Sequence, residues 1–293
     1  MKKKHIILAL KILFILSAFA FVFWKADTSK IFGYIKSTNP LYLVFAYVIM
    51  TCAQILSACR MRFYYSREGL ELSRKFSIGL YLTCMLFNTV LPGGIGGDGY
   101  KIYTIGKFTK FPRLKAFRLA VSERASGLFA LLLLTSIFYI YTDFKEIIPK
   151  QDSIIAFLAI LLIPSYLISI RILLKEKLKT AFMASSFSFP IQLLNVLIVV
   201  VLLVDLGSDI NNIQNIISYV VIFMASSVAS ILPISIGGAG LREITFYYGA
   251  QFIGLNAELG IAVALLFFIV NIMCSLNGLL FWHRLERIYN AKA

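Results

Sequence analysis

Two glycine-rich stretches interrupt apolar segments of the chain: LPGGIGGDG at residues 91–99 and LPISIGGAG at residues 232–240. They start 141 residues apart and agree at six of nine positions. Glycine and proline at this density do not sustain a helix, so each stretch is predicted to break the helix that leads into it. Lys101 follows the first break at the same offset at which Arg242 follows the second.

The segments around the breaks are those of a membrane protein. Of the 293 residues, 59% are hydrophobic and only 15% are charged, whereas a soluble domain carries about 25% charged residues. The mean hydropathy is +0.84. Apolar runs long enough to cross about 30 Å of hydrocarbon recur from end to end. We therefore predict an all-α integral membrane protein, with residues 1–293 forming a single membrane domain.

The two breaks occupy equivalent places in the two halves of the chain. Each half has two apolar runs, then the broken segment, then one more apolar run, which predicts an internal repeat of about 1–142 and 143–293. If each broken segment enters the membrane and returns to the same side, each half crosses three times and the halves have opposite orientations. The predicted architecture is about six transmembrane helices plus two re-entrant broken-helix hairpins in an inverted repeat.

The distribution of positive charge favours this topology. With the N-terminus in the cytoplasm, the outer connectors 25–40, 142–152 and 205–212 carry three, two and no Lys or Arg. The inner connectors 60–75, 107–118 and 171–179 carry five, five and four. This is the positive-inside bias, so both termini are expected in the cytoplasm and the protein in the cell (inner, cytoplasmic) membrane. The segment 60–75 is also predicted to lie on the headgroups as an amphipathic stretch.

Composition argues against several other classes of protein. The formal charge is +15, but Lys and Arg form short clusters between hydrophobic runs, which favours anionic lipid over nucleic acid as the partner. The four cysteines lie in apolar runs without metal or disulfide spacing, and the two histidines lie at the termini. We expect no metal, no cofactor and no catalytic histidine. The apolar run from Ile6 to Trp24 is longer than a signal-peptide core, so we expect an uncleaved first helix.

The breaks themselves are the candidate binding site. Unpaired backbone groups in lipid are tolerated only where protein shields them or where they line a polar cavity. Inverted hairpins that meet near the midplane are a recurring arrangement of transporters. Half-helices after Gly99 and Gly240 would begin beside Lys101 and Arg242, a combination of helix N-terminus and cation that suits a phosphate.

Some residues near the breaks allow more than one interpretation. Asp98 can cap the half-helix, contact the substrate, or do both. Glu123 and Arg124 begin a long apolar run, where they form either part of a pathway, an internal pair, or charges that reach the cytoplasmic headgroups. Arg242 and Glu243 have fewer routes to water, which favours function or a buried pair. Several amides are expected to bridge helices: Asn88, Gln192, Asn195, Asn271 and Asn277.

These motifs resemble a known family, the transmembrane, flippase-like domain of lysylphosphatidylglycerol synthases. The similar pieces are residues 92–98, then Glu123-Arg124 followed by Gly127, and residues 233–243. The family usually has Asp-Arg where this chain has Glu-Arg. The resemblance implies membrane translocation of a polar lipid and a role in the cell envelope. This chain lacks the family's soluble aminoacyl-transferase domain, so we do not expect it to make the lipid.

The sequence thus predicts a membrane lipid transporter or flippase, not an enzyme, that moves a phosphate-bearing or otherwise polar lipid between leaflets. The alternatives are a non-transporting lipid-binding partner of a cell-envelope glycosyltransferase and an intramembrane lipid-modifying enzyme. A homodimer or an envelope-biosynthesis enzyme is the expected protein partner. The predicted substrate-binding residues are Pro92, Gly93, Gly94, Gly96, Gly97, Asp98, Lys101, Glu123, Arg124, Pro233, Ser235, Gly237, Gly238, Gly240, Arg242 and Glu243.

Overall fold

The computed structural model describes Leu13 and residues 16–91, 96–142, 151–173, 178–231 and 238–291. Every regular element in these ranges is a helix, which confirms the all-α prediction. In chain order they are α2 (Thr28–Ser37), α3 (Pro40–Arg67), α4 (Arg74–Val90), α5 (Gly96–Thr109), α6 (Arg113–Tyr139), α8 (Gln151–Ile168), the π-helical η1 (Ser169–Leu173), α9 (Leu178–Asp205), α10 (Ile213–Ala229), α11 (Leu241–Phe252), α12 (Ala257–Trp282) and α13 (Leu285–Asn290).

Four helices are long and apolar enough to cross a bilayer: α3, α6, α9 and α12. Each has 26 to 28 residues, which at 1.5 Å per residue exceeds a hydrocarbon core of about 30 Å. The other two predicted crossings coincide with the shorter apolar helical segments Leu16–Lys25 and Ile160–Arg171. Local sequence sets the starts of several helices, since Asn39 caps α3 ahead of Pro40 and Ser73 caps α4.

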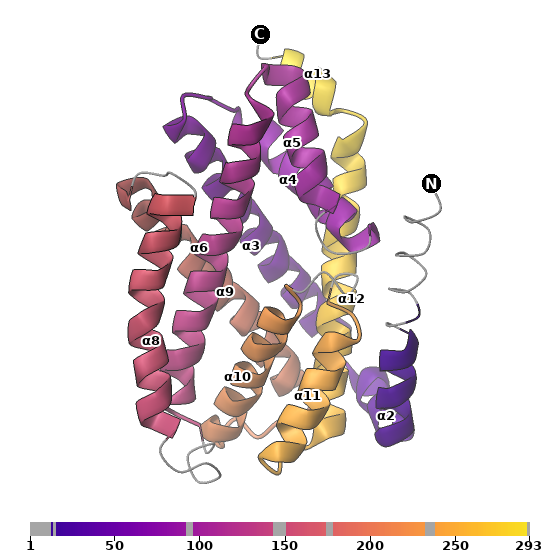
Figure 1. The fold of residues 1–293 in the computed structure, drawn as a ribbon. Helices are drawn as coiled ribbons and strands as arrows, with labels where there is room; N and C mark the ends of the chain where they lie inside the picture. Colours follow the sequence, from indigo (N-terminus) through magenta and orange to yellow (C-terminus); the bar gives the residue numbers. More distant parts are fainter. Residues whose placement is uncertain are drawn as a thin grey trace.

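The two broken segments form hairpins at opposite ends of the bundle. In Figure 1, α4 descends from the upper end to the middle and α5 returns upward, whereas α10 rises from the lower end to the middle and α11 returns downward. The members of each hairpin pack against each other. Their re-entry into a bilayer from opposite faces stays a prediction.

The helix pairs that pack together are those expected if a two-fold axis relates the two halves of the chain. Under the predicted repeat, α3 corresponds to α9, α4 to α10, α5 to α11 and α6 to α12. The packing of α4 on α12 has its counterpart in α10 on α6, and that of α5 on α6 in α11 on α12. The self-paired contact is α3 on α9. The repeat itself stays a prediction.

Glycines allow the first hairpin to pack closely against its neighbours. A Cβ at Gly278 of α12 would lie 2.5 Å from the carbonyl oxygen of Leu82 on α4. A Cβ at Gly97 of α5 would overlap the carbonyl oxygen of Cys84. Close backbone approach at small residues is the usual way in which membrane helices associate, and here it fixes α4 between α5 and α12.

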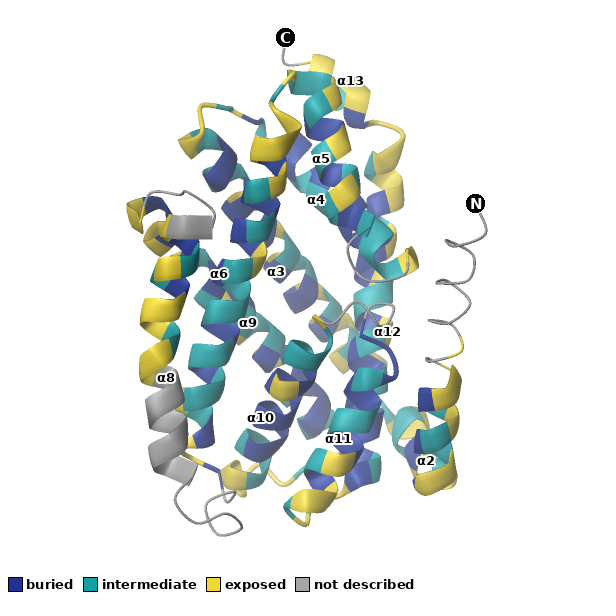
Figure 2. Cartoon of the chain, viewed as in Figure 1, coloured by how far each residue is buried: buried dark blue, intermediate teal, exposed yellow. Residues whose placement is uncertain are grey.

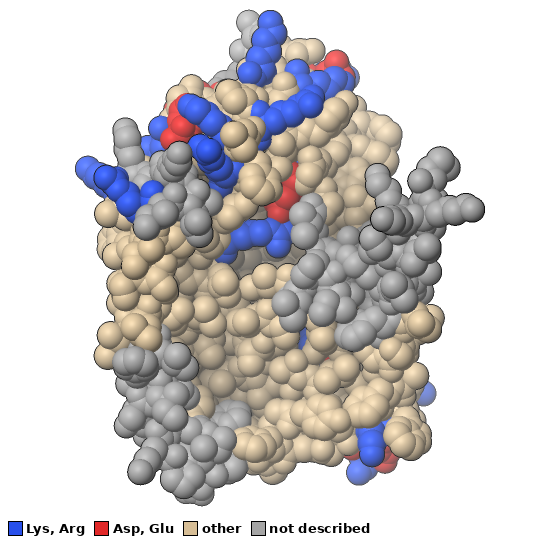
Figure 3. Space-filling view, viewed as in Figure 1, with Lys and Arg blue, Asp and Glu red and all other residues tan. Residues whose placement is uncertain are grey.

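Charge and burial follow the expected membrane orientation. Figure 2 shows buried residues on the inward faces of the helices and exposed residues on the outside of α8 and α2. In Figure 3, Lys and Arg gather at the upper end, where α13 lies, and are few at the lower end. The described parts of the connectors predicted to be inside and outside therefore lie at opposite ends of the molecule, and which end faces the cytoplasm stays a prediction.

The structure adds one detail to the sequence prediction and corrects another. The connector 25–40 contains a helix, α2, whose N-terminus is capped by Asp27. The segment 60–75 is not a single amphipathic stretch on the headgroups, because α3 continues without a break to Arg67. Arg60, Tyr64 and Tyr65 on this last part of α3 are buried.

Candidate functional site

A polar cavity lies between two apolar cores. The larger core joins the start of α3 and the end of α9 to α10–α12, and the smaller one joins the end of α3 to α4, α5, the start of α6 and α13. Between them are two adjoining cavities of about 500 Å³ and 210 Å³. Both are lined by Gln54, Arg60, Tyr81, Glu123 and Arg124. We call them together the central cavity.

One face of α3 supplies polar side chains to this cavity. Met50, Gln54, Ser57 and Arg60 line it at helical spacing. The Arg60 side chain is buried, with the residue 7% exposed. Its Nη1 donates to Ser188 Oγ on α9 at 2.8 Å, and its Nε has no partner among the described residues. Arg60 was missed by the sequence prediction, although a polar stripe of Gln54, Ser57 and Arg60 within an apolar run is a signal that could have found it.

Arg242 enters the same cavity from the second hairpin. Gly240 precedes α11 with φ of 84°, a conformation that favours glycine, and Arg242 lies in the first turn. Arg242 is 8% exposed. Its guanidinium carbon lies 4.6 Å from the ring centroid of Phe267 and 5.6 Å from that of Phe223. Its Nε has no partner among the described residues, and no carboxylate among them forms an ion pair with it. Of the two roles expected for Arg242, function or a buried pair with Glu243, the described ion pairs do not include the second, and a role in function stays a prediction.

Lys101 differs from Arg242 because its charge is already neutralised. Its Nζ lies 2.9 Å from Glu123 Oε2 on α6 and 3.4 Å from Asp98 Oδ1, one turn earlier on α5. Lys101 and Glu123 are almost fully buried. Arg124 Nε donates to Asp98 Oδ2 at 2.5 Å. Lys101 is predicted to bind the substrate phosphate, and in the structure its charge is already paired with Glu123 and Asp98. Of the three roles considered for Glu123, the structure shows the internal pair.

The first half-helix begins earlier than predicted. It starts at Gly96, so Asp98 lies inside the first turn of α5 and not before it. Asn88 Oδ1 accepts the backbone N–H of Gly97 at 2.8 Å, which ties the end of α4 to the start of α5. Asp98 thus acts on the neighbouring helix through Arg124 as well as on its own helix through Lys101.

Figure 3 shows a hollow about half-way down the front face of the bundle, in which basic and acidic atoms lie together within an otherwise uncharged surface. The charged residues that line the central cavity are Arg60, Asp98, Lys101, Glu123, Arg124 and Arg242. Among these six, cations outnumber carboxylates by two. Arg124 has a side chain that is 42% exposed, whereas Asp98 is 15% exposed.

Comparison with known proteins assigns this architecture to a family. The family model described as "Lysylphosphatidylglycerol synthase TM region" matches residues 7–182 and 167–278. The chain belongs to the lysylphosphatidylglycerol synthase TM region family. It is also 27% identical over 143 residues to a UPF0104 membrane protein of Methanocaldococcus jannaschii. That alignment covers 48% of this chain and 39% of the archaeal protein. The chain is therefore a multi-pass membrane protein of a family connected with lipid metabolism or transport.

Gly127, one turn after Glu123-Arg124, lies beside Arg60. A Cβ at this position would lie 3.4 Å from Arg60 Nη1, an ordinary van der Waals distance. The carbonyl of Gly127 accepts Gln192 Nε2 of α9 at 3.2 Å. This part of α6 therefore carries Glu123 and Arg124 of the paired cluster and is joined to α9 beside Arg60.

The remaining predicted site residues fall into two groups. Glu243 does not line the central cavity. Its Oε2 accepts the backbone N–H of Gly240 at 2.6 Å, and the side chain is buried. Gly238 has φ of 88°, and a Cβ there would lie 2.7 Å from Ser230 Oγ. The predicted site residues that lie outside the described ranges are Pro92, Gly93, Gly94, Pro233, Ser235 and Gly237.

The amides predicted to bridge helices are divided between packing and cavity. Asn277 on α12 exchanges hydrogen bonds with Tyr47 of α3 at 2.8 and 3.0 Å, so it bridges helices as predicted. Gln192 bridges α9 to α6 and also lines the cavity. Asn195 and Asn271 line the cavity as well. Within the described ranges, no three His, Cys, Asp or Glu side chains are grouped as a metal site would require.

Proposed function

We propose that the central cavity binds the phosphate-bearing headgroup of an anionic lipid and that the protein carries this lipid between leaflets. The observation that carries the proposal is that Arg60 and Arg242, one from each half of the chain, line one cavity and form no ion pair among the described residues. A buried cation without a direct ion pair is costly in a membrane protein. An anionic ligand would offset that cost for both arginines at once.

The chemistry of the lining supports a phosphate. Guanidinium groups bind phosphate through parallel N–H donors, and each of these arginines has a buried Nε without a partner in the described structure. Gln54, Asn195 and Asn271 add neutral polar groups to the same wall. These amides can donate to or accept from the hydroxyl or ester oxygens that surround a lipid phosphate.

Size and surroundings support a lipid as the source of that phosphate. A volume of about 500 Å³ suits a headgroup. The same cavity has apolar walls at Leu128, Leu131 and Phe223. The hollow in Figure 3 lies on the side of the bundle, from which acyl chains could remain in the bilayer while the headgroup occupies the cavity.

The arrangement of the hairpins supports transport as opposed to binding alone. Two broken helices that run to the middle of the bundle from opposite ends can expose one site alternately to each side when one half rocks against the other. In this proposal the protein is a carrier and not an enzyme, and it resides in the cell membrane with its basic end in the cytoplasm. The paired cluster of Asp98, Lys101, Glu123 and Arg124 holds α5 to α6 during the movement.

The test is a flipping assay with purified protein in vesicles that contain phosphatidylglycerol labelled on one acyl chain, in which a membrane-impermeant reductant reports the fraction in the outer leaflet. Arg60→Gln and Arg242→Gln each remove a charged hydrogen-bond donor, and a loss of about 1.5–3 kcal/mol lowers the rate about 10- to 100-fold. Arg67→Gln is the matched control, because Arg67 lies on the same helix as Arg60 but is exposed.

The outcomes separate the candidate functions. If both cavity variants and the Arg67→Gln control flip lipid at the wild-type rate, the proposed site is ruled out. Lipid that remains bound to the wild-type protein but is not moved would favour the non-transporting partner of an envelope glycosyltransferase. Conversion of the labelled lipid to a new species, detected by mass spectrometry, would instead favour an enzyme.

A further inference from the structure

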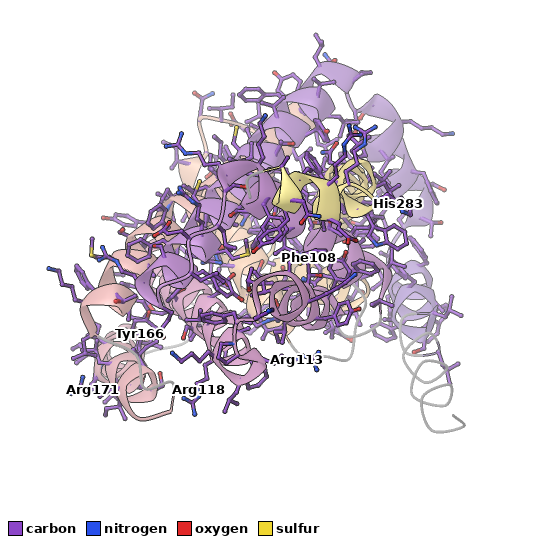
Figure 4. The ribbon with its side chains drawn as sticks, turned by 90° about the horizontal axis from the view of Figure 1, so that it is seen from above. Phe108, Arg113, Arg118, Tyr166, Arg171 and His283 are labelled. Carbon is purple, nitrogen blue, oxygen red and sulfur yellow. The ribbon has the colours of Figure 1, made fainter. Side chains whose placement is uncertain are left out.

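A second basic site lies at the upper end of the bundle, away from the central cavity. A groove of about 920 Å³ is lined by Arg74 and Lys75 at the start of α4 and by Arg284 and Arg287 at the end of α12 and in α13. It shares no lining residue with the central cavity. We call it the terminal groove. Figure 4 places His283, the residue before Arg284, on the opposite side of this end from Arg118 and Arg171.

The four cations of the terminal groove are unneutralised. No carboxylate lines the groove, and none of the four side chains forms an ion pair within the described ranges. Three described acidic residues near this end pair with other cations: Glu71 with Arg62, Glu68 with Lys115, and Glu286 with Lys107. The groove is therefore a concentration of positive charge without an internal counter-ion.

The start of α4 strengthens the attraction for an anion. Ser73 caps this helix by accepting the backbone N–H of Phe76 at 3.2 Å, and Arg74 and Lys75 form its first turn. The positive end of the helix dipole thus points to the same groove as the four side chains.

The apolar part of the groove continues along the outside of α12. Leu280 and Phe281 line the groove beside Ile288. Leu280 is 63% exposed, and exposed apolar residues recur along the same face of α12 at helical spacing: Ile269, Met273 and Leu276. Phe281 is held in place by close packing, because a Cβ at Gly79 would lie 2.8 Å from its ring. A cationic recess above an exposed apolar stripe matches the two parts of a phospholipid.

We infer that the terminal groove binds an anionic glycerophospholipid of the adjacent leaflet, with the phosphate among the four cations and an acyl chain along Leu280, Leu276 and Met273. The inference does not rest on the proposed function of the central cavity. Inorganic phosphate carries the negative charge of a phospholipid but has no acyl chain to contact the apolar stripe. An acidic protein segment would bind the four cations without needing that stripe. Each cation near an anionic lipid surface contributes measurably to binding.

The chain offers a local fluorescent reporter for this site. It has two tryptophans, Trp24 and Trp282. Trp282 follows Phe281 and is 40% exposed, so a Trp24→Phe protein carries one tryptophan next to the groove. Reconstitution with lipids that are brominated on the acyl chains quenches this fluorescence when the lipid occupies the groove. Brominated phosphatidylglycerol is expected to compete for this position about tenfold more effectively than brominated phosphatidylcholine.

The decisive variant replaces all four groove cations by Gln: Arg74, Lys75, Arg284 and Arg287. In this variant, phosphatidylglycerol and phosphatidylcholine are expected to compete about equally for the groove. Each pairwise variant, Arg74→Gln with Lys75→Gln or Arg284→Gln with Arg287→Gln, should lose about half of the free energy of the preference, which leaves a ratio of about threefold. The matched control removes four other basic side chains of the same end and leaves Lys107 with Glu286: Arg67, Lys110, Arg113 and Lys115. It should keep the full preference. Inorganic phosphate at millimolar concentration should not relieve the quenching.

Three results would overturn the inference. Equal quenching by both lipids in the wild-type background would show no anionic lipid site and would favour an acidic protein segment as the occupant. A preference that persists in the quadruple and both pairwise variants would place the lipid elsewhere. Relief of quenching by inorganic phosphate would make the groove a free-anion site. Because the readout is lipid occupancy and not flipping, failure of the central-cavity proposal leaves these outcomes unchanged.

Discussion

The buried pair of Lys101 and Glu123 gives the sharpest test of the site geometry. Their side chains are 3% and 4% exposed, and Nζ lies 2.9 Å from Oε2. Lys101→Met removes the cation from between two carboxylates. Asp98 keeps Arg124 at 2.5 Å, but Glu123 loses its only ion pair within the described ranges. Loss of one member of a buried pair costs about 3–5 kcal/mol, and we expect this variant near the upper value.

Removal of the other member of the pair, Glu123, should destabilise the protein less. Glu123→Leu leaves Lys101 with Asp98 at 3.4 Å, so its expected cost is about 3 kcal/mol. The double variant leaves neither charge unpaired and should be less destabilised than Lys101→Met alone, because replacing a whole buried pair by apolar residues is often close to neutral. This order of stabilities is specific to a buried pair.

The assay is thermal unfolding in detergent, followed by size-exclusion chromatography of the remaining folded protein. A loss of about 4 kcal/mol corresponds to a shift on the order of 10 °C for a protein of this size. Lys107→Met is the control on the same helix: Lys107 is 50% exposed and lies 3.9 Å from Glu286, so little change is expected. If Lys101→Met unfolds within about 2 °C of that control yet stops flipping, Lys101 is a ligand and the pairing described above is not its role.

Two further predictions concern the break and the topology. Gly97→Ala should destabilise the protein by at least about 2 kcal/mol, because its Cβ would overlap a backbone carbonyl of α4, whereas Gly99→Ala, which has open space around it, should not; equal melting temperatures would contradict the close approach. Single cysteines at Lys115 and Gln251, in a background without the native cysteines, should react with impermeant maleimide from opposite sides of the membrane; labelling of both from the same side would eliminate the pair of opposed hairpins.

The fold could be predicted from sequence because its determinants are local. The runs that became α3, α6, α9 and α12 are long and apolar, so length and hydropathy alone identify them. The two breaks are visible as glycine and proline. The end of α3 was misjudged for the opposite reason. Arg60 and Arg62 look alike in sequence, but Arg62 donates to the carbonyl of Leu72 at the surface while Arg60 turns into the cavity.

The roles of the charged residues could not be read from the repeat because pairing depends on which helix packs opposite. Lys101 and Arg242 occupy equivalent places after the two breaks, yet only Lys101 faces an acidic residue on a neighbouring helix. One clue was present: three residues before Lys101 stands Asp98, whereas three residues before Arg242 stands Ala239. Glu123 of α6 is also apparent in the sequence, but no rule of sequence spacing predicts that residues 101 and 123 are in contact.

The asymmetry has a mechanical consequence. If Lys101 and Arg242 were both free, the two hairpins would offer one cation each and the ligand would lie between the breaks. In the proposed carrier, the neutralised Lys101 leaves ligand binding in the first half to Arg60 on α3, a continuous helix that packs along α9. A headgroup held by Arg60 and Arg242 therefore contacts an unbroken helix of one half and a half-helix of the other. Because the ligand then touches both halves at once, its binding energy depends on their relative position, and a change in that position is what a rocking carrier requires.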